Sequence, residues 1–366
     1  MARFLKYGIT TGASAAAAAK AAVIALVGNS VDRVVIPTPI GLRFEIPVKE
    51  SKKLSEDSAV ATVVKDAGDD IDATDKIEIF ATVKLTSDGK VTIKSGKGVG
   101  KVTKPGLAVP VGESAINPVP RRMIRDAVKE ELPQGKGAEV TIDIPEGEKV
   151  AKKTLNANLG IVGGISVLGT TGVVKPLSIE ACRRSLVPQI DVALAEGYKR
   201  VFVVPGNIGE RITKKLFKVP DEAIIQTGDF MGYMFKKAVE KGVQEIMLLG
   251  HPGKLAKLAA GIFNTHHKMG DARAEVIAAY AGAVGADSET INGIVQSNTT
   301  EEASELLKQV GLSRVTFDMI AEKVRSRVME RIQRKAEVSV IIVSLDGAIL
   351  GADKTAMCGE PWLNSA

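Results

Sequence analysis

The second half of this 366-residue chain repeats one pattern, in which a short apolar segment ends in a glycine-containing turn and a helix signal follows. Such alternation predicts a parallel sheet covered by helices on both faces. In an open sheet of this kind, the carboxyl ends of the strands lie along one edge, where ligands bind. The apolar segments span residues 159–168, 200–204, 223–226 and 245–249, and their turns lie near residues 170, 206, 228 and 251.

The first of these segments, residues 159–172, is the stretch around which we expect the chain to be organised. Three glycines interrupt its apolar run, which closes on Gly169-Thr170-Thr171-Gly172, and Ser178 then signals the start of a helix. Glycines let the backbone approach a ligand closely, and the free N–H groups of a helix start attract electron-rich groups. The alternative is a structural turn between strand and helix that binds nothing.

Between and after these apolar segments, apolar residues recur at helical spacing, and one further apolar run near the end of the chain predicts a last strand. We therefore expect residues 156–366 to form a Rossmann-like, doubly wound, mostly parallel α/β domain. Helices are expected at 178–197, 208–217, 230–241, 255–285, 300–311 and 315–334, and a last strand at 338–345.

The first half lacks this alternation, and residues 1–155 are expected to form an α+β domain built on an antiparallel sheet. An alanine-rich helix over 13–27 has almost no side-chain volume, so its neighbours can pack close to its backbone. Helices are also expected at 57–67 and 119–131, and strands at 32–36 and 42–48. Two hairpins are expected, one pairing 76–85 with 90–94 and one pairing 138–144 with 148–154.

A long glycine- and proline-rich loop spans residues 95–122, and long loops in compact domains are usually functional. Gly96, Gly98 and Gly100, with three lysines within 95–106, are typical of an anion cradle, so a small-molecule phosphotransferase is an alternative function. The Lys-Ser/Thr ending of a Walker motif is missing, which counts against it. Arg121, at the start of the helix expected over 119–131, is a candidate for binding substrate carboxylates, or part of a solvated face.

Composition narrows the choice of partners. The net charge of +6 and pI near 9.1 favour an acidic partner or simply solubility, and a basic nucleic-acid-binding protein is a second alternative. Aromatic residues make up only 4% of the chain, too few for a base-stacking surface. The two cysteines, Cys182 and Cys358, form no metal motif, and no apolar run reaches membrane-spanning length. These features predict a cytoplasmic protein that binds neither nucleic acid nor membrane.

All three histidines follow the segment at 245–249, but their spacing does not predict a metal site. Adjacent residues on a helix point about 100° apart, so His266 and His267 do not readily share an ion there. We expect no protein-bound metal. The same region is densely cationic, which suits a substrate with several carboxylates, the alternative being a basic solvent-exposed face. The cationic residues of this segment are Lys254, Lys257, His266, His267, Lys268 and Arg273.

The chain resembles the CbiD family, the cobalt-precorrin-5B C1-methyltransferases of the oxygen-independent cobalamin pathway. The resemblance runs in order along nearly the whole chain. One departure is Ser14, where relatives often have cysteine, which argues against an essential thiol there. The stretches that carry the resemblance are residues 8–18, 98–107, 112–121, 159–172, 205–209, 228–232, 250–258 and 265–273.

The resemblance implies methyl transfer from S-adenosylmethionine to C-1 of a cobalt-bound tetrapyrrole, giving cobalt-precorrin-6A. Cobalt then arrives with the substrate, and the partners to expect are the tetrapyrrole, other cobalamin-pathway enzymes and a second copy of the chain. Such a transfer is an in-line displacement, so the protein mainly aligns the reactants and excludes water.

Site residues follow from the turns and the cationic segment. The donor crevice is assigned to Thr170, Thr171, Gly172, Gly206, Asn207, Gly228 and Asp229. The tetrapyrrole is assigned to Arg121, Lys254, His266, His267 and Arg273. Asp229 and His251 are candidates for accepting a proton. Many nucleotide-binding sheets place an acidic residue after the second strand. If 200–204 is the second strand, that position is Asn207, which either substitutes or indicates a different arrangement.

Overall fold

The computed structural model describes residues 4–357, and the chain divides into two compact units, Met1–Ile179 and Glu180–Ala366. Cys358 and Trp362 lie outside the described residues. The division falls later than the predicted boundary at 155/156. Residues beyond that boundary pair with strands of the first unit. The pairs are β11 (Ile161–Val162) with β9 (Lys101–Val102), β12 (Gly164–Ile165) with β8 (Gly98–Val99), and β13 (Val173–Val174) with β1 (Gly8–Ile9).

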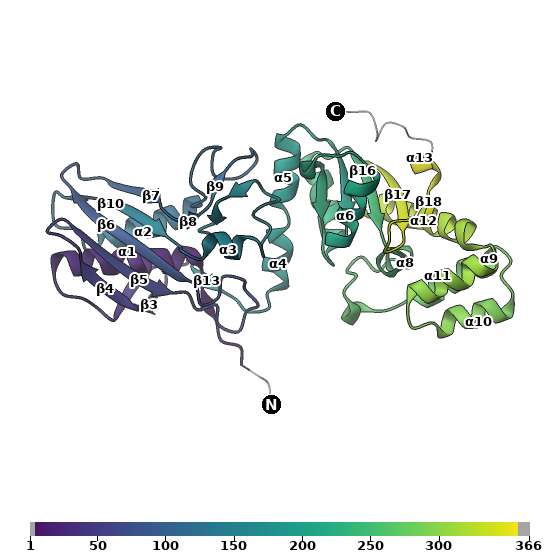
Figure 1. Ribbon diagram of the computed structural model, residues 1–366, viewed down its shortest axis with the longest axis horizontal. Coiled ribbons are helices and arrows are strands. Elements are labelled where there is room, and N and C mark those ends of the chain that lie inside the picture. Colours follow the sequence, from purple (N-terminus) through teal and green to yellow (C-terminus); the bar gives the residue numbers. More distant parts are fainter. Residues whose placement is uncertain (1–3, 358–366) are drawn as a thin grey trace. The chain divides into compact units, whose positions relative to one another are not determined.

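The first unit is built on a mostly antiparallel sheet (Figure 1, purple to teal). Its five strands occur in the order β4-β5-β6-β10-β7, and only β10 and β7 run parallel. A separate hairpin joins β2 (Arg33–Pro37) to β3 (Arg43–Pro47). The sheet strands are β4 (Glu50–Lys53), β5 (Ser58–Val64), β6 (Glu78–Thr86), β10 (Gly137–Asp143) and β7 (Val91–Ser95).

Helix α1 (Thr11–Val27) forms the centre of this unit. It packs against β5 and β6 on the sheet and against α2 (Pro118–Lys129) and β2. Its alanines from Ala13 to Ala22 are almost wholly buried, because a helix without bulky side chains lets neighbours approach from every direction. The predicted alanine-rich helix is confirmed.

Three predictions in the first unit are wrong. The helix predicted over 57–67 is absent, and residues 58–64 form strand β5, in which Ala59, Ala61 and Val63 alternate toward α1. The strands predicted at 76–85 and 90–94 exist but form no hairpin, because β10 lies between them. Residues 148–154 are not a strand, and the short helix α3 (Gly147–Ala151) occupies that region.

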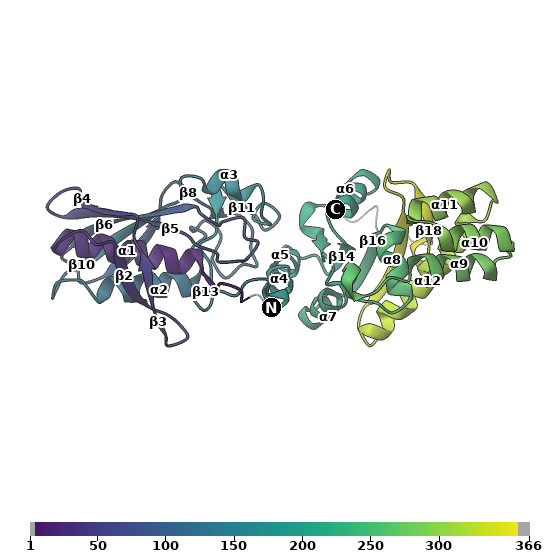
Figure 2. The same cartoon turned by 90° about the horizontal axis from the view of Figure 1, so that it is seen from below.

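The second unit is a doubly wound sheet with strand order β15-β14-β16-β17-β18, shown from another side in Figure 2. The first four strands run parallel, as predicted, and β18 is an antiparallel edge strand that the sequence analysis missed. The predicted mixed fold class is therefore confirmed. The strands are β15 (Ile224–Gln226), β14 (Arg200–Val204), β16 (Glu245–Gly250), β17 (Glu337–Val343) and β18 (Ile349–Ala352).

Side chains alternate between the two faces of this sheet. Phe202 and Val204 of β14 pack with Ile212 of α6 (Asn207–Leu216) on one face. Val201 and Val203 face the opposite way, toward the larger core that most of the helices cover. That side includes α5 (Pro188–Ala195), α7 (Met231–Lys241), α8 (Pro252–Ala259), α9 (Arg273–Ala283), α11 (Thr300–Gln309) and α12 (Ser313–Arg331).

Two predicted helices are interrupted. The segment 178–197 divides into α4 (Ile179–Ser185) and α5, which begins at Pro188 because proline suits a helix start and not its interior. The segment 255–285 divides into α8 and α9, separated by an irregular stretch and the short 3-10 helix η2 (His267–Met269). Helix α10 (Ser288–Gln296) was not predicted. Helix α11 begins with a capping box formed by Thr299 and Glu302.

The remaining short elements of the second unit are η1 (Asp221–Ala223) and α13 (Lys354–Met357). Among residues 4–357, no helix combines the length and apolar character needed to cross a membrane.

The segment predicted to organise the chain, residues 159–172, is not a strand of the parallel sheet. It contributes β11 and β12, which are two-residue strands of the first unit. Gly164 packs against the Gly98 backbone, where an added Cβ would lie 2.0 Å from the Gly98 carbonyl oxygen. Gly164 therefore allows close backbone packing, and Gly160 and Gly169 also lie close to the side chains of Lys104 and Thr10, whereas a Cβ on Gly163 would meet nothing within 4 Å.

Candidate functional site

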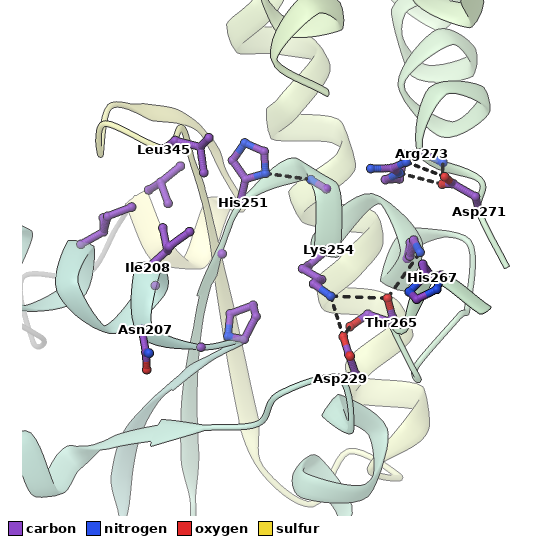
Figure 3. Close-up of a pocket in the computed structure, with 18 residues that line it drawn as sticks. Asn207, Ile208, Asp229, His251, Lys254, Thr265, His267, Asp271, Arg273 and Leu345 are labelled. Atoms are coloured by element: carbon purple, nitrogen blue, oxygen red, sulfur yellow. Dashed lines mark hydrogen bonds and ion pairs between the residues drawn. The ribbon is translucent and has the colours of Figure 1, made fainter. Parts of the chain in front are cut away.

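The second unit has a topological switch point between β14 and β16. The chain leaves β14 toward α6 on one face of the sheet and leaves β16 toward α8 on the other. Such a divergence opens a crevice at the carboxyl ends of the strands. A cavity of about 480 Å³ lies there, lined by the ends of β14, β16 and β17 and by residues that precede α7 and α9 (Figure 3).

Two glycines shape the β14–α6 turn, Gly206 and Gly209. A Cβ on Gly209 would lie 2.9 Å from the Cβ of Val204, so glycine permits the close approach of helix to strand. A Cβ on Gly206 would meet nothing within 4 Å, so the turn is open there. These are the roles of the last two glycines in the nucleotide-binding fingerprint G-x-G-x-x-G, whose first position is Val204 here.

One wall of the cavity is apolar and the opposite wall is charged. Figure 3 shows Ile208 and Leu345 on one side and Lys254, Asp229 and Arg273 on the other. The apolar wall comprises Pro205, Ile208, Ile212, Val343 and Leu345. Ligand sites commonly combine apolar lining with a few placed polar groups.

Asp229 follows β15, which is the second strand of the sheet because β14 is the first. The acidic residue that the sequence analysis found missing is therefore present in the usual place, and the strand count was wrong. Oδ1 of Asp229 accepts hydrogen bonds from Lys254 Nζ at 2.5 Å and Thr265 Oγ1 at 3.0 Å. Burial raises the pKa of Asp229, but these two bonds outweigh it and hold the pKa below 3.8. Asp229 is thus an ionised carboxylate and a weak base.

His251 is the N-cap of α8. Its Nδ1 accepts a hydrogen bond from Gly253 N at 3.1 Å, and its Nε2 lies 2.9 Å from Glu301 Oε1. Burial lowers the pKa of His251 below 6.5, against the opposing effect of Glu301 and together with the nearby Arg273. A neutral imidazole with the proton on Nε2 satisfies both contacts. Neither ring nitrogen is then available as a base, which argues against the predicted proton-accepting role.

The segment before α9 supplies the outer part of the charged wall. The Arg273 guanidinium donates to both carboxylate oxygens of Asp271, at 2.7 and 2.5 Å, and lowers the pKa of Asp271 to about 2. His267 lines the cavity and is exposed. His266 does not line it, and its Nδ1 accepts from Lys268 N at the start of η2.

Several predicted site residues lie elsewhere. Thr170, Thr171 and Gly172 belong to the first unit, where the Gly172 carbonyl accepts from Thr10 N at 3.0 Å, and the crevice of the second unit is lined without them. Arg121 also belongs to the first unit, and its guanidinium donates to the carbonyls of Ile116 and Ser114. Gly228 lies beside Asp229 in the left-handed region, with φ +55°, but does not line the cavity.

The structure brings Gly206, Asn207, Asp229, His251, Lys254, His267 and Arg273 around one cavity. Thr265 and Asp271 join them, although the sequence analysis did not assign them. Their only sequence signal is that both lie in the stretch 265–273, which carries the family resemblance. Thr265 acts through Asp229, which is distant in sequence, and Asp271 acts through the turn that brings it to Arg273.

The glycines of the 95–106 loop do not form the predicted anion cradle. Gly98 has φ +72°, and a Cβ there would lie 1.8 Å from the Ile144 carbonyl oxygen. A Cβ on Gly100 would lie 2.3 Å from the Ile161 side chain. These glycines pack against protein, which removes the basis of the phosphotransferase alternative.

A crevice with one apolar and one charged wall, at the switch point of a doubly wound sheet, defines a ligand-binding α/β protein. Residues 1–176 match the family described as CbiD, and residues 264–354 match the CbiD C-terminal domain. The chain belongs to the CbiD family.

Individual relatives cover nearly the full length of the chain. A cobalt-precorrin-5B C(1)-methyltransferase of Methanocaldococcus jannaschii is 49% identical over 95% of this chain and 96% of its own length. A protein of the same name from Moorella thermoacetica is 44% identical over 97% of each chain. A crystal structure of cobalamin biosynthesis protein CbiD from Archaeoglobus fulgidus is 30% identical, covers 74% of this chain and 84% of its own, and superposes with a TM-score of 0.39.

Proposed function

We propose that this chain transfers a methyl group from S-adenosylmethionine to C-1 of cobalt-precorrin-5B, giving cobalt-precorrin-6A. As a member of the CbiD family, it is a methyltransferase of cobalamin biosynthesis. The cobalt belongs to the tetrapyrrole and is substrate. The enzyme acts in the cytoplasm, beside the enzymes that make its substrate and consume its product.

The donor site is supported chiefly by one observation: the Gly206–Gly209 turn and Asp229 line the same cavity. They follow the first and second strands of the sheet at its switch point, where nucleotide-like ligands bind in this fold. The adenosine lies against the apolar wall. Both hydrogen bonds to the Asp229 carboxylate end on Oδ1, so Oδ2 accepts from the ribose hydroxyls or the amino group of the donor.

The transfer is an in-line displacement in which the carbon nucleophile forms a bond to the methyl group and the C–S electron pair returns to sulfur. It requires no covalent enzyme intermediate. Asp229 stays ionised and His251 is engaged through both nitrogens, so their roles are to hold the donor and the start of α8. Catalysis rests on alignment of the reactants and exclusion of water.

Isothermal titration calorimetry of the full chain with S-adenosylhomocysteine, ATP and duplex DNA tests the proposal. S-adenosylhomocysteine is expected to bind in a one-to-one ratio, and ATP and DNA are not. Transfer of labelled methyl from S-adenosylmethionine to cobalt-precorrin-5B tests the reaction itself. Tight binding of ATP together with no binding of S-adenosylhomocysteine would overturn the donor assignment.

A further inference from the structure

Lys257 of α8 is a buried cation that lines the cavity. Its residue is only 4% exposed, and its Nζ donates to the Thr265 carbonyl oxygen at 3.3 Å. No carboxylate among residues 4–357 forms an ion pair with it within 4.0 Å. An ammonium group has three donors, and burying it without a counter-charge is strongly unfavourable.

The other buried lysines of the described chain are paired. Lys20 lies 2.6 Å from Glu130 and 3.1 Å from Glu131, and Lys65 lies 2.7 Å from Asp72. Their exposed fractions, 5% and 1%, bracket that of Lys257. This protein thus supplies carboxylates to its buried lysines where they serve structure, and Lys257 is the exception.

The remaining cations around the cavity are also neutralised by neighbours. Lys254 pairs with Asp229, and Arg273 forms a two-pronged pair with Asp271. An incoming anion must compete with those carboxylates for either group. At Lys257 it competes with one carbonyl oxygen, so Lys257 offers the stronger attraction for an anion that enters the crevice.

We infer that Lys257 Nζ binds a carboxylate of the ligand that occupies the crevice. The inference rests on the proposed function, which supplies two carriers of the same alkyl carboxylate chemistry. One is the amino-acid end of S-adenosylmethionine, and the other is an acidic side chain of the tetrapyrrole. The bound carboxylate supplies a counter-charge within ion-pair distance, whereas Asp271, whose charge acts on Lys257 from farther away, is bonded to Arg273.

The test compares the wild-type chain with Lys257→Met, because methionine has a similar volume and carries no charge. Lys308→Met is the matched control, since Lys308 is exposed on α11, outside the cavity, and loses the same charge. Thermal unfolding checks that each variant is folded, and Lys257→Gln serves as a second variant. Calorimetry uses S-adenosylhomocysteine and 5′-methylthioadenosine, which lacks the amino-acid end.

If Lys257 holds the donor carboxylate, Lys257→Met weakens S-adenosylhomocysteine binding by about 10- to 100-fold, the cost of losing a charged hydrogen bond. Binding of 5′-methylthioadenosine stays unchanged. If it holds a tetrapyrrole carboxylate, donor affinity is unchanged and KM for cobalt-precorrin-5B rises by a similar factor. Each result supports the inference and identifies the carrier.

Unchanged donor affinity together with unchanged KM in both folded Lys257 variants would overturn the inference while leaving the proposed function intact. No S-adenosylhomocysteine binding to the wild-type chain would instead count against the donor site itself. The two failures are therefore distinguishable. Lys308→Met is expected to match the wild type in every measurement.

Discussion

Two glycine-rich segments of this chain look alike in sequence and differ in what surrounds them. In 159–172, Gly164 and Gly169 lie so close to other residues that an added Cβ would fall 2.0 Å from the Gly98 oxygen and 2.5 Å from the Thr10 hydroxyl. In the turn at 205–209, Gly206 faces open space beside a cavity. Glycines of the first kind allow dense packing, whereas glycines of the second kind leave room for a ligand.

A glycine motif therefore indicates that other atoms approach the backbone closely, but it does not indicate whether those atoms belong to the protein or to a ligand. At Gly164 and Gly169 the approaching atoms belong to the protein itself, and in the second unit we expect them to belong to a ligand. The comparison predicts opposite consequences for substitution at the two places, on stability in one and on binding in the other.

The largest effect is expected for Gly164→Ala. The added methyl group has no flexible neighbour to displace, so we expect the variant to lose about 3 kcal/mol or more of stability. Thermal and denaturant unfolding followed by circular dichroism measure this loss. A variant as stable as the wild type would show that this segment is not tightly packed.

Asp229→Ala is expected to have the next largest effect. It removes the carboxylate proposed to hold the donor and leaves Lys254 without its carboxylate partner, so S-adenosylhomocysteine affinity should fall by about 10- to 100-fold. The protein should remain folded, because the residue is only partly buried. Calorimetry measures the affinity, and an unchanged value in a folded variant would mean that the crevice is assigned to the wrong ligand.

Gly206→Thr is the counterpart of Gly164→Ala in the second unit. Gly206 has extended backbone with φ 172°, and threonine caps helices about as well as glycine, so stability should change by no more than about 0.5 kcal/mol. The new side chain fills part of the open turn and should weaken S-adenosylhomocysteine binding about tenfold. Loss of stability without loss of affinity would reverse the distinction drawn between the two segments.

The smallest expected effect concerns His251 and pH. Burial holds the pKa of His251 below 6.5, so the unfolded chain takes up a proton at a higher pH than the folded chain does. The stability that His251 contributes is therefore complete above pH 6.5 and is lost as pH falls toward the folded-state pKa.

His251→Asn tests this dependence, because asparagine keeps an N-cap acceptor but does not titrate. Unfolding measured from pH 8 down to about pH 5 should show a shallower loss of stability in the variant than in the wild type. The two curves should converge above pH 6.5, where the imidazole is neutral in both the folded and the unfolded chain. Parallel curves would show that His251 does not change its protonation on unfolding.

Much of the second unit was predictable because its signals are local. Strand segments such as 200–204 and 245–249 are short apolar runs, and the helix starts carry their own caps, as Thr299 and Glu302 do. The break between α8 and α9 was missed, because helical spacing of apolar residues continues across it, whereas Pro188 is a local signal for the interruption that separates α4 from α5. In the first unit, β5 was mistaken for a helix, because a run of apolar residues fits both periods.

The candidate site was only partly predictable for a different reason. Asp229 and Lys254 were recognised from their places after strands, but their ion pair required the fold. The same holds for the two contacts that occupy both nitrogens of His251. Pairing partners such as Thr265 and Glu301 are distant in sequence and carry no spacing signal.

The sequence by itself determined the family, the alternation of strands and helices in the second unit, and the chemistry-bearing residues at the strand ends. Those features depend on the local pattern of residues and on the order of motifs along the chain, both of which can be read from the sequence. Only the tertiary structure decided that 159–172 belongs to the first unit, that β10 lies between β6 and β7, and that Lys257 lacks a carboxylate partner. Strand pairing and charge pairing join residues far apart in the chain, so their outcome depends on three-dimensional packing.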